Sequence, residues 1–494
     1  MVNTFLDLKP NNVWKHFYAL TQIPRPSGLM EEITAFVENF GKSLGLETTR
    51  DAANNICIRK SATPGYENRQ TIILQSHLDM VPQANSDMKF DFKHDVIQAY
   101  IDGDWVKAKG TTLGADNGIG VAATMAILEA TDLQHGPLEG LFTTDEETGM
   151  YGALAVRPGF INGKIMLNLD SETDGELYIG CAGGEDVTVS FQYENEPIPF
   201  QEPIVVKISL TGLKGGHSGV DIHLGRGNAN KLIFRFLKDA MQKQDARMVS
   251  IQGGTLRNAI PREAFATIVV NGETNYQSLM SLVDYYHKVF TAEFDGVEDT
   301  IELKAERLAS PTEQLRLIPL EIQKKLTHAI VGCRNGVVNR FARIPDTTET
   351  SINMAIVKSN EQSIEIKFLA RSASETKKRA ICSTVESTFI NAGANHISIA
   401  NGYPGWNPNP DSTILQIMKK VYETQRMHTP RVEVMHAGLE CGIILSNVPG
   451  LDTVSFGPTI QFPHSPDERV EIASVQKFWD FLTGILREAP KNTK

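Results

Sequence analysis

Short apolar stretches that alternate with helical patterns are the feature that most constrains how this chain folds. The segments with strand character are Asn55–Arg59, Thr71–Gln75, Leu138–Phe142 and Ile165–Leu169. Apolar residues at helical spacing occur at Met30–Glu47, and a helix rich in small residues is expected at Gly118–Ala130. Strands that alternate with helices are typical of an α/β domain. The sequence therefore predicts a mostly parallel, twisted sheet flanked by helices.

Polar clusters follow apolar stretches at four places in the first half of the chain. They are His77 and Asp79 in SHLDMVP, Asp116 in GTTLGADNG, Glu146 and Glu147 in TDEETG, and Asp170 in NLDSE. Three of the four come directly after a predicted strand, and ligands bind beyond the carboxyl ends of strands in open α/β sheets. A fifth candidate, His464, lies in FGPTIQFPHSPDE after a strand that ends at Phe456. Imidazole and carboxylate groups can therefore converge at one edge of the sheet.

Divalent metal ions would make such a cluster stable. Three carboxylates in one crevice repel each other unless some are protonated or a cation compensates their charge. Imidazole with carboxylate suits zinc, and also cobalt or manganese. One carboxylate can bridge two ions about 3.5–4 Å apart. Asp79 is placed to accept the second N–H of the His77 ring, and one carboxylate of the Glu146–Glu147 pair can remain free as a general base.

Each of these patterns has a non-functional interpretation when it stands alone. His and Asp occur together in many loops, adjacent glutamates usually lie on a solvated surface, and Asp-Asn-Gly is typical of a turn. The functional interpretation depends on all of them occurring in order, each after an apolar stretch.

Composition and charge exclude several classes of protein. The 494 residues contain 48 Lys and Arg against 59 Asp and Glu, and the net charge of −11 argues against a nucleic-acid binder. No apolar run approaches the roughly 20 residues of a membrane span, and the N-terminus shows no secretory signal. The five cysteines are scattered without a CxxC pair, which predicts buried thiols and a cytoplasmic location.

The chain is expected to contain one domain interrupted by another. The candidate site residues named so far lie before residue 200 and again after residue 430. The segment between them has a different pattern of strand and helix candidates and few candidate catalytic residues. We expect a discontinuous domain formed by residues 1–202 and 398–494, with an inserted α+β domain at 203–397.

Taken together, the five motifs resemble those of the dinuclear-zinc exopeptidases related to carboxypeptidase G2 and carnosinases. The similarity is greatest to the bacterial cytosolic aminoacyl-histidine dipeptidases, the Xaa-His dipeptidase (peptidase D) branch. It extends through middle segments such as LKGGHSGVDIHLGRGNANK, GGTLRNAIPREAFATI and HAGLECG, and reaches the last helix. The resemblance implies a catalytic domain interrupted by a lid and dimerisation domain, and a homodimer.

The resemblance also implies roles for the site residues. One zinc ion would be bound by His77, Asp116 and Asp170, and the other by Asp116, Glu147 and His464. Glu146 would be the general base that takes a proton from the water between the ions, and Asp79 would orient His77. In this family the peptide bond after the bridging Asp, here Asp116–Asn117, is commonly cis.

For residues of the inserted domain, roles are indicated only by the resemblance. His217 in GGHSG matches the histidine that, in dimeric relatives, reaches the partner's active site and stabilises the oxyanion. Asn258 and Arg371 match residues that contact substrate, with the arginine gripping the C-terminal carboxylate. A salt bridge is the alternative for Arg371. For His223 and His436 we expect structural roles.

The favoured function is hydrolysis of dipeptides that end in histidine, including carnosine-like β-alanyl peptides. A tripeptidase or an N-acyl amino acid amidohydrolase could use the same metals, and a non-catalytic binding protein is a further alternative. Ser218 in GGHSGV lacks the GxSxG pattern of a serine hydrolase. The glycines near Cys181 are not followed by the lysine of a phosphate-binding loop.

Overall fold

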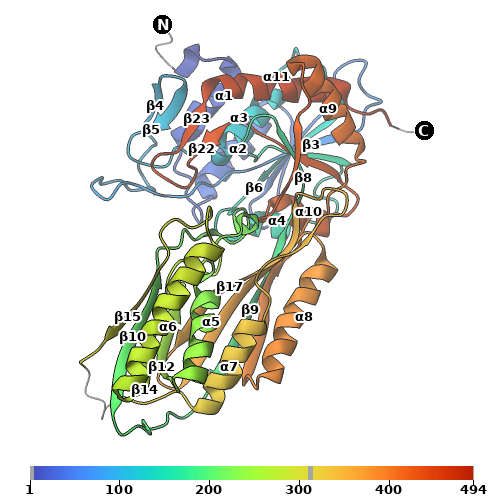
Figure 1. Ribbon diagram of the computed structural model, residues 1–494. Coiled ribbons are helices and arrows are strands. Elements are labelled where there is room, and N and C mark those ends of the chain that lie inside the picture. Colours follow the sequence, from blue (N-terminus) through green and yellow to red (C-terminus); the bar gives the residue numbers. More distant parts are fainter. Residues whose placement is uncertain (1–4, 310–314, 493–494) are drawn as a thin grey trace. The chain divides into compact units, whose positions relative to one another are not determined.

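The computed structural model describes residues 5–309 and 315–492, which form two compact units (Figure 1). Within them, unit 1 comprises the chain up to Cys181, Trp406–Val434 and the chain from Leu439 onward; unit 2 comprises Ala182–Gly405 and Met435–Gly438. The division thus lies after residues 181 and 405, whereas the sequence placed it after 202 and 397. The reason is that β9 (Gly183–Gln192) and β19 (His396–Tyr403) pair with each other within the sheet of unit 2.

Unit 1 is built on an eight-stranded sheet whose centre is parallel. Its strand order is β1-β2-β6-β3-β7-β21-β8-β20. The strands are β1 (Glu47–Arg50), β2 (Ile56–Lys60), β3 (Ile72–His77), β6 (Leu138–Thr143), β7 (Ile165–Asn168), β8 (Glu176–Cys181), β20 (Arg431–Met435) and β21 (Asp452–Ser455). Strands β6, β3, β7 and β21 run parallel, while β1, β2 and β8 join antiparallel to their neighbours. The expected α/β fold is confirmed, with antiparallel edges added.

Helices cover this sheet according to their apolar patterns. They are α1 (Asn11–Thr21), α2 (Glu31–Ser43), α3 (Ala115–Glu129), α4 (Tyr151–Ala155), α9 (Thr413–Arg426), α10 (Glu440–Asn447) and α11 (Ile472–Glu488). Helix α3 is buried on nearly all sides, because it is made almost entirely of small and apolar residues. Helix α2 is shorter than the Met30–Glu47 expected, because the chain turns at Gly45 and begins β1 at Glu47.

A small antiparallel sheet in unit 1 carries the C-terminal candidate ligand. Its order is β22-β23-β5-β4, with the bounds β4 (Ala99–Asp102), β5 (Trp105–Ala108), β22 (Ile460–Gln461) and β23 (Arg469–Glu471). Strands β22 and β23 pair antiparallel, so the segment between them forms the loop of a hairpin. That loop contains His464.

Unit 2 is an α+β sandwich of one large sheet and long helices. The sheet order is β15-β10-β14-β12-β17-β18-β9-β19, with β16 beside β17. Besides β9 and β19, the strands are β10 (Pro203–Thr211), β12 (Arg247–Gly253), β14 (Ala264–Asn271), β15 (Glu302–Arg307), β16 (Gly336–Arg340), β17 (Thr348–Ser359) and β18 (Ser363–Ser372). A two-stranded ribbon pairs β11 (Gly216–His217) with β13 (Ala259–Ile260).

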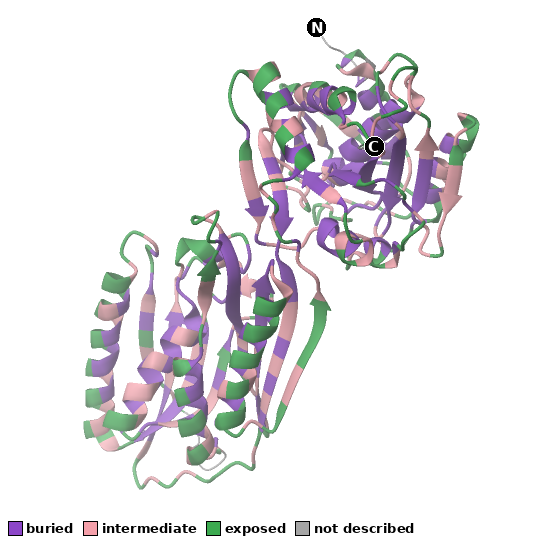
Figure 2. Cartoon of the chain, turned by 90° about the vertical axis from the view of Figure 1, so that its right-hand side faces the viewer, coloured by how far each residue is buried: buried purple, intermediate pink, exposed green. Residues whose placement is uncertain are grey.

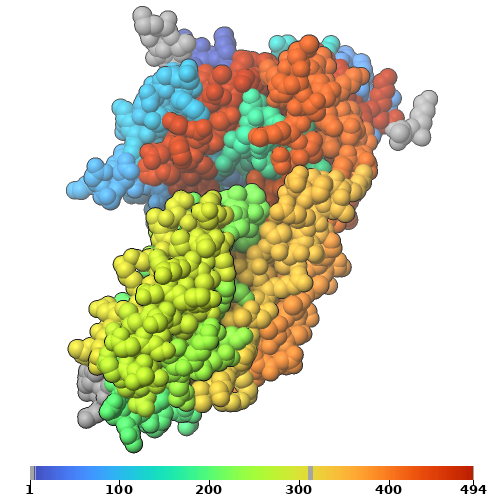
Figure 3. Space-filling model, viewed as in Figure 1, coloured from blue at the N-terminus to red at the C-terminus, as the bar shows by residue number. Residues whose placement is uncertain are grey.

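The helices of unit 2 are α5 (Ala229–Lys243), α6 (Gly272–Glu293), α7 (Leu320–Gly332) and α8 (Glu375–Asn391). Figure 1 shows them on the same side of the sheet, and their side chains hide much of it in the space-filling view (Figure 3). The central strands of both large sheets are buried along much of their length (Figure 2). Among the described residues, no helix combines the length and apolar character that a membrane crossing requires.

Candidate metal centre

Three parallel strands of unit 1 end side by side and carry candidate ligands at or just beyond their last residues. His77 is the last residue of β3 and lies opposite Thr143 at the end of β6. Glu146 and Glu147 follow β6, and Asp170 follows β7. Because neighbouring parallel strands end at the same edge, these groups from distant parts of the sequence meet there, as the sequence predicts.

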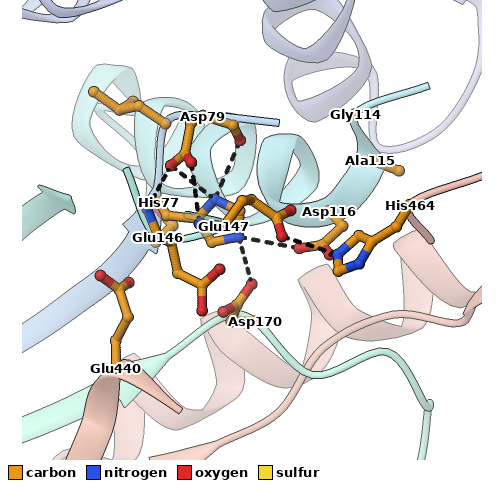
Figure 4. A network of polar contacts seen from close by, with 12 residues as sticks. His77, Asp79, Gly114, Ala115, Asp116, Glu146, Glu147, Asp170, Glu440 and His464 are labelled. Atoms are coloured by element: carbon orange, nitrogen blue, oxygen red, sulfur yellow. Dashed lines mark hydrogen bonds and ion pairs between the residues drawn. The ribbon is translucent and has the colours of Figure 1, made fainter. Parts of the chain in front are cut away.

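Two further candidate ligands come from other elements. Asp116 lies in the first turn of α3, where its backbone departs from helical geometry, and the Asp116–Asn117 peptide is cis as expected. His464 lies in the hairpin loop between β22 and β23, and its side chain is 53% exposed. Figure 4 shows both residues directed toward the groups at the ends of the strands.

The ligand atoms form two overlapping groups that share Asp116. In the first, His77 Nε2 lies 3.1 Å from Asp116 Oδ1 and 3.3 Å from Asp170 Oδ1. In the second, His464 Nε2 lies 3.3 Å from Asp116 Oδ2 and 3.0 Å from Glu147 Oε2. Within each group the candidate ligand atoms all lie within 4.8 Å of one another. Asp116 presents one oxygen to each group, which is the arrangement a bridging carboxylate requires.

The metal-free cluster has strongly perturbed protonation equilibria. Hydrogen bonds with Asp116 and Glu147 raise the pKa of His464 to about 11. Burial lowers the pKa of His77, but its acidic neighbours, Asp170 foremost, hold it well above its ordinary value. Burial raises the pKa of Asp170 to about 6. Burial would also raise the pKa of Asp116, but its bonds with the two histidines hold it below the ordinary range. Protonated imidazoles thus supply the positive charge in this state.

The donor set fits divalent metal ions. Two imidazoles and three carboxylates match the ligands of zinc, cobalt or manganese. Glu147 Oε1 is buried without a hydrogen-bond partner among the described residues. A buried polar atom without a partner is destabilising, and a bound cation would satisfy this one.

We expect metal binding to release protons and the metal affinity to rise with pH. In the metal-free protein the raised pKa of His464 keeps its ring protonated at neutral pH, whereas only the unprotonated nitrogen binds a metal. Competition from protons therefore weakens as the pH increases. Calorimetric titration of the apo protein in buffers with different ionisation enthalpies measures the number of protons released. Affinity that is constant between about pH 6 and pH 8 would contradict this expectation.

Asp79 contacts more than the histidine it was expected to orient. Its Oδ1 lies 3.5 Å from His77 Nδ1, and its backbone carbonyl oxygen lies 3.2 Å from the same nitrogen. The two carboxylate oxygens also accept the backbone N–H groups of Glu146 at 3.0 Å and Glu147 at 3.2 Å, and Ser27 Oγ donates at 2.7 Å. Asp79 therefore holds the loop that carries both glutamates and faces the imidazole.

Glu146 lies beside the cluster without belonging to either overlapping group. One of its oxygens lies within 4.8 Å of ligand atoms of His77 and Glu147, which makes these three residues a third candidate ligand group, one that does not include Asp116. Figure 4 shows its carboxylate next to Asp170, on the side facing Glu440. Burial raises the pKa of Glu146 well above its ordinary value. A carboxylate with this location and a raised pKa suits a general base.

Several buried polar residues around the cluster have no predicted role. Glu440, at the start of α10, accepts hydrogen bonds from Gln75 Nε2 at 2.6 Å and Thr143 Oγ1 at 2.7 Å. Burial raises the pKa of Glu440 to about 8. Its sequence signal is its place in HAGLECG, a motif that carried no assignment. Arg25 and Glu468 likewise had no predicted role, although Glu468 is the last residue of the motif that contains His464.

In unit 2, the geometry of His217 fixes its tautomer. Its Nδ1 accepts the backbone N–H groups of Gly219 and Val220, each at 3.1 Å. Burial and the charge of Arg371 lower its pKa, which favours the neutral ring. A neutral ring whose Nδ1 accepts carries its proton on Nε2. His217 is therefore built to donate a hydrogen bond through Nε2.

Arg371 is buried close to His217. It is 4% exposed, its Nη2 lies 3.5 Å from His217 Nε2, and its Nη1 donates to Tyr403 Oη at 2.9 Å. Its Nε has no hydrogen-bond partner, and Arg371 forms no ion pair with a carboxylate of the described residues. The salt-bridge alternative therefore has no counterpart in the described chain. Asn258 adjoins this group, since its backbone carbonyl accepts Ser218 N–H at 2.8 Å.

His436 and His223, for which we expect structural roles from the sequence, differ in their surroundings. His436 is buried and lies 2.8 Å from Ser351 Oγ, and burial lowers its pKa to about 3. This environment is that of a neutral structural histidine. His223 is exposed.

Comparisons with known proteins agree with this geometry. The model of peptidase family M20/M25/M40 matches residues 73–488. Cytosol non-specific dipeptidase of Escherichia coli (strain K12) is 42% identical over 485 residues, which is 98% of each chain. The crystal structure of aminoacylhistidine dipeptidase from Vibrio alginolyticus has a TM-score of 0.93 and 42% identity, covering 99% of both chains. Aminopeptidase PepT from Bacillus cereus, at 17% identity and a TM-score of 0.56, shares the fold over 98% of this chain and 99% of its own.

These matches confirm the family resemblance and the fold class that the motifs predict. The family model spans most of the chain, including every residue of the two overlapping ligand groups. The chain is therefore a member of peptidase family M20/M25/M40.

Proposed function

We propose that the protein is a two-zinc dipeptidase that prefers dipeptides ending in histidine, including carnosine-like peptides. The observation that carries the proposal is the pair of ligand groups that share Asp116, with the free carboxylate of Glu146 beside them. His77, Asp116 and Asp170 would hold one ion, and Asp116, Glu147 and His464 the other; cobalt or manganese could substitute. When bound, such ions polarise a scissile carbonyl and lower the pKa of water.

The residues of the chain then perform the proton transfers and the orientation. Glu146 takes the proton of the attacking water and passes it to the leaving amine. Asp79 holds the backbone of Glu146 and Glu147 and so keeps the base in register with the ligands. His217 reaches the active site of the partner subunit and donates from Nε2 to the developing oxyanion there, since its Nδ1 is already engaged.

Substrate ends are recognised by residues of unit 2 in this proposal. Arg371 binds the C-terminal carboxylate bidentately, and Asn258 contacts the substrate. The support is that Arg371 is a buried guanidinium with an unused Nε and no carboxylate partner among the described residues. Unit 2 is proposed as the lid and as the dimerisation domain of a cytoplasmic homodimer. Sedimentation showing only monomer at assay concentration would exclude the dimer.

The printed names of the relatives leave the breadth of specificity open. One relative is named a non-specific dipeptidase and the other an aminoacylhistidine dipeptidase, at the same 42% identity. A tripeptidase or an N-acyl amino acid amidohydrolase on the same metals is the alternative. It is less favoured because both of these relatives are dipeptidases.

Hydrolysis of a matched substrate panel tests the proposal. The panel is Ala-His, Gly-His, β-Ala-His, Ala-Leu, Ala-Ala-His, N-acetyl-His and the amide of Ala-His. We expect the dipeptides ending in histidine to be cleaved fastest. The amide should be cleaved poorly, because it lacks the carboxylate for Arg371. Cleavage confined to Ala-Ala-His or N-acetyl-His would replace the proposal with the alternative, and equal rates for Ala-His and Ala-Leu would remove the histidine preference.

A further inference from the structure

The backbone of residues 113–116, which leads into the bridging Asp116, converges on one buried carboxylate. Glu468 Oε2 accepts the N–H groups of Leu113 at 2.7 Å and Gly114 at 2.9 Å. Its Oε1 accepts those of Ala115 at 2.8 Å and Asp116 at 3.2 Å. Four consecutive N–H groups that point at one anion form a concave nest, and here the anion belongs to the chain itself.

Glu468 connects this nest to the other ligand loop. It lies four residues after His464, at the end of the loop between β22 and β23, and its own N–H donates to the Ser465 carbonyl at 3.0 Å. Glu468 is 2% exposed, whereas the side chain of His464 is 53% exposed. The candidate ligand His464 is therefore attached to Asp116 through a single carboxylate and two short backbone segments.

Arg25 holds the same loop from its other side. Its Nη2 donates to the Gly114 carbonyl at 2.5 Å, and its Nη1 donates to the carbonyls of Leu78 at 2.8 Å and Asp79 at 3.2 Å. The guanidinium is 2% exposed. Gly114 has a φ of +71°, and a Cβ there would lie 2.5 Å from Arg25 Nη2, so the close approach requires glycine. Arg25 thus joins the loop after β3 to the loop before α3.

We propose that Glu468 and Arg25 are positioning residues that set the spacing between the two metal positions. Glu468 fixes Asp116 relative to His464, and Arg25 fixes Asp116 relative to the loop that carries His77 and Asp79. Arg25 lies outside residues 73–488, the part matched by the family model, and neither residue belongs to a candidate ligand group among the described residues. The inference rests on the two-metal centre proposed above.

Glu468→Gln is the variant that separates this role from simple loop packing. A glutamine has nearly the same shape, but its amide nitrogen must face two of the four N–H donors, which leaves them without an acceptor. Glu139→Gln is the matched control. Glu139 is also 2% exposed, accepts the backbone N–H groups of Asn162 at 2.9 Å and Gly163 at 3.0 Å, and lies near the start of β6, away from the strand ends that carry the ligands.

The test measures Co²⁺ binding to the apo protein. Competition titration gives the affinity, and the visible absorption spectrum reports the environment of the bound ion. We expect Glu468→Gln to weaken Co²⁺ binding about 10- to 100-fold, as loss of groups that orient ligands does. The loss should be greatest at the position that His464 completes, with an altered spectrum. Arg25→Lys should also weaken Co²⁺ binding, because an ammonium cannot contact both loops in the same way. The loss should be smaller than in Glu468→Gln. Glu139→Gln should bind Co²⁺ like the wild type, even where its thermal stability falls.

Each outcome decides between the roles. Wild-type affinity and spectrum in folded Glu468→Gln would overturn the proposal, as would equal losses in Glu139→Gln. If Glu468→Gln does not fold, Glu468→Asp gives the same test, since it retains the charge but is one methylene too short to receive all four bonds. A wild-type protein that binds no Co²⁺ would instead contradict the proposed function.

Discussion

Replacing Glu146 by alanine is expected to leave metal binding unchanged and to lower kcat by about 10²–10⁴-fold. Glu146 lies outside the two overlapping ligand groups, so its loss removes a proton acceptor without removing a ligand from either. The change should fall on kcat rather than KM, because the proton transfer occurs in the transition state. Steady-state kinetics on Ala-His, with metal content measured on the same sample, tests both halves of the expectation.

Glu147→Ala is the matched comparison for this variant. The two glutamates are neighbours on one loop, and both donate their backbone N–H to Asp79. Glu147 Oε2 lies 3.0 Å from His464 Nε2, so its removal should weaken metal binding at that position. Near-normal turnover in Glu146→Ala, or equal metal loss in the two variants, would show that Glu146 is not the base.

The convergence of the candidate ligands could be predicted because it follows from strand order. His77, Glu147 and Asp170 come at or just after the ends of adjacent parallel strands, and an apolar strand followed by a polar cluster is visible in sequence. Asp116 and His464 lie on a helix start and a hairpin loop, so the residue pattern indicated only that they could converge with the others, and the family resemblance assigned each its place in the cluster. The structure places all five together.

The supporting contacts could not be predicted, because they join side chains to the backbone of distant loops. The four N–H groups that bind Glu468 carry no residue-specific signal, since any non-proline residue supplies one. Arg25 binds only carbonyl oxygens, so no acidic partner in the sequence reveals it. Asp79 was expected to orient His77. Its hydrogen bonds to the backbone of Glu146 and Glu147 were not expected, because they depend on the path of that loop in the folded chain.

The domain boundaries of the structure differ from the expected ones for a related reason. The alternating residues of β9 indicate a half-buried strand, but they do not reveal which sheet the strand joins. Its ten-residue pairing with β18 is a contact across more than 170 positions of the chain, and it places β9 in unit 2. Local pattern predicts the element, whereas long-range pairing determines the domain.

Removing the metal ions is expected to lower hydrolysis of Ala-His by about 10³-fold or more. Polarisation of the carbonyl and activation of water by bound ions contribute several kcal/mol, and each 1.36 kcal/mol is about a tenfold change in rate. Zinc, cobalt or manganese added to chelated wild-type protein should restore activity. Full activity that persists after verified metal removal would contradict a metal-dependent mechanism.

Asp116→Asn should reproduce the loss without being rescued by metal. Asp116 contributes Oδ1 to the group of His77 and Oδ2 to the group of His464, and asparagine replaces one of these oxygens with an amide nitrogen that cannot bind a cation. One substitution therefore weakens both positions, whereas Asp170→Asn, which alters only the group of His77, should spare the position completed by Glu147 and His464. Metal titration that gives two ions per chain at wild-type affinity in Asp116→Asn would show that this carboxylate does not bridge.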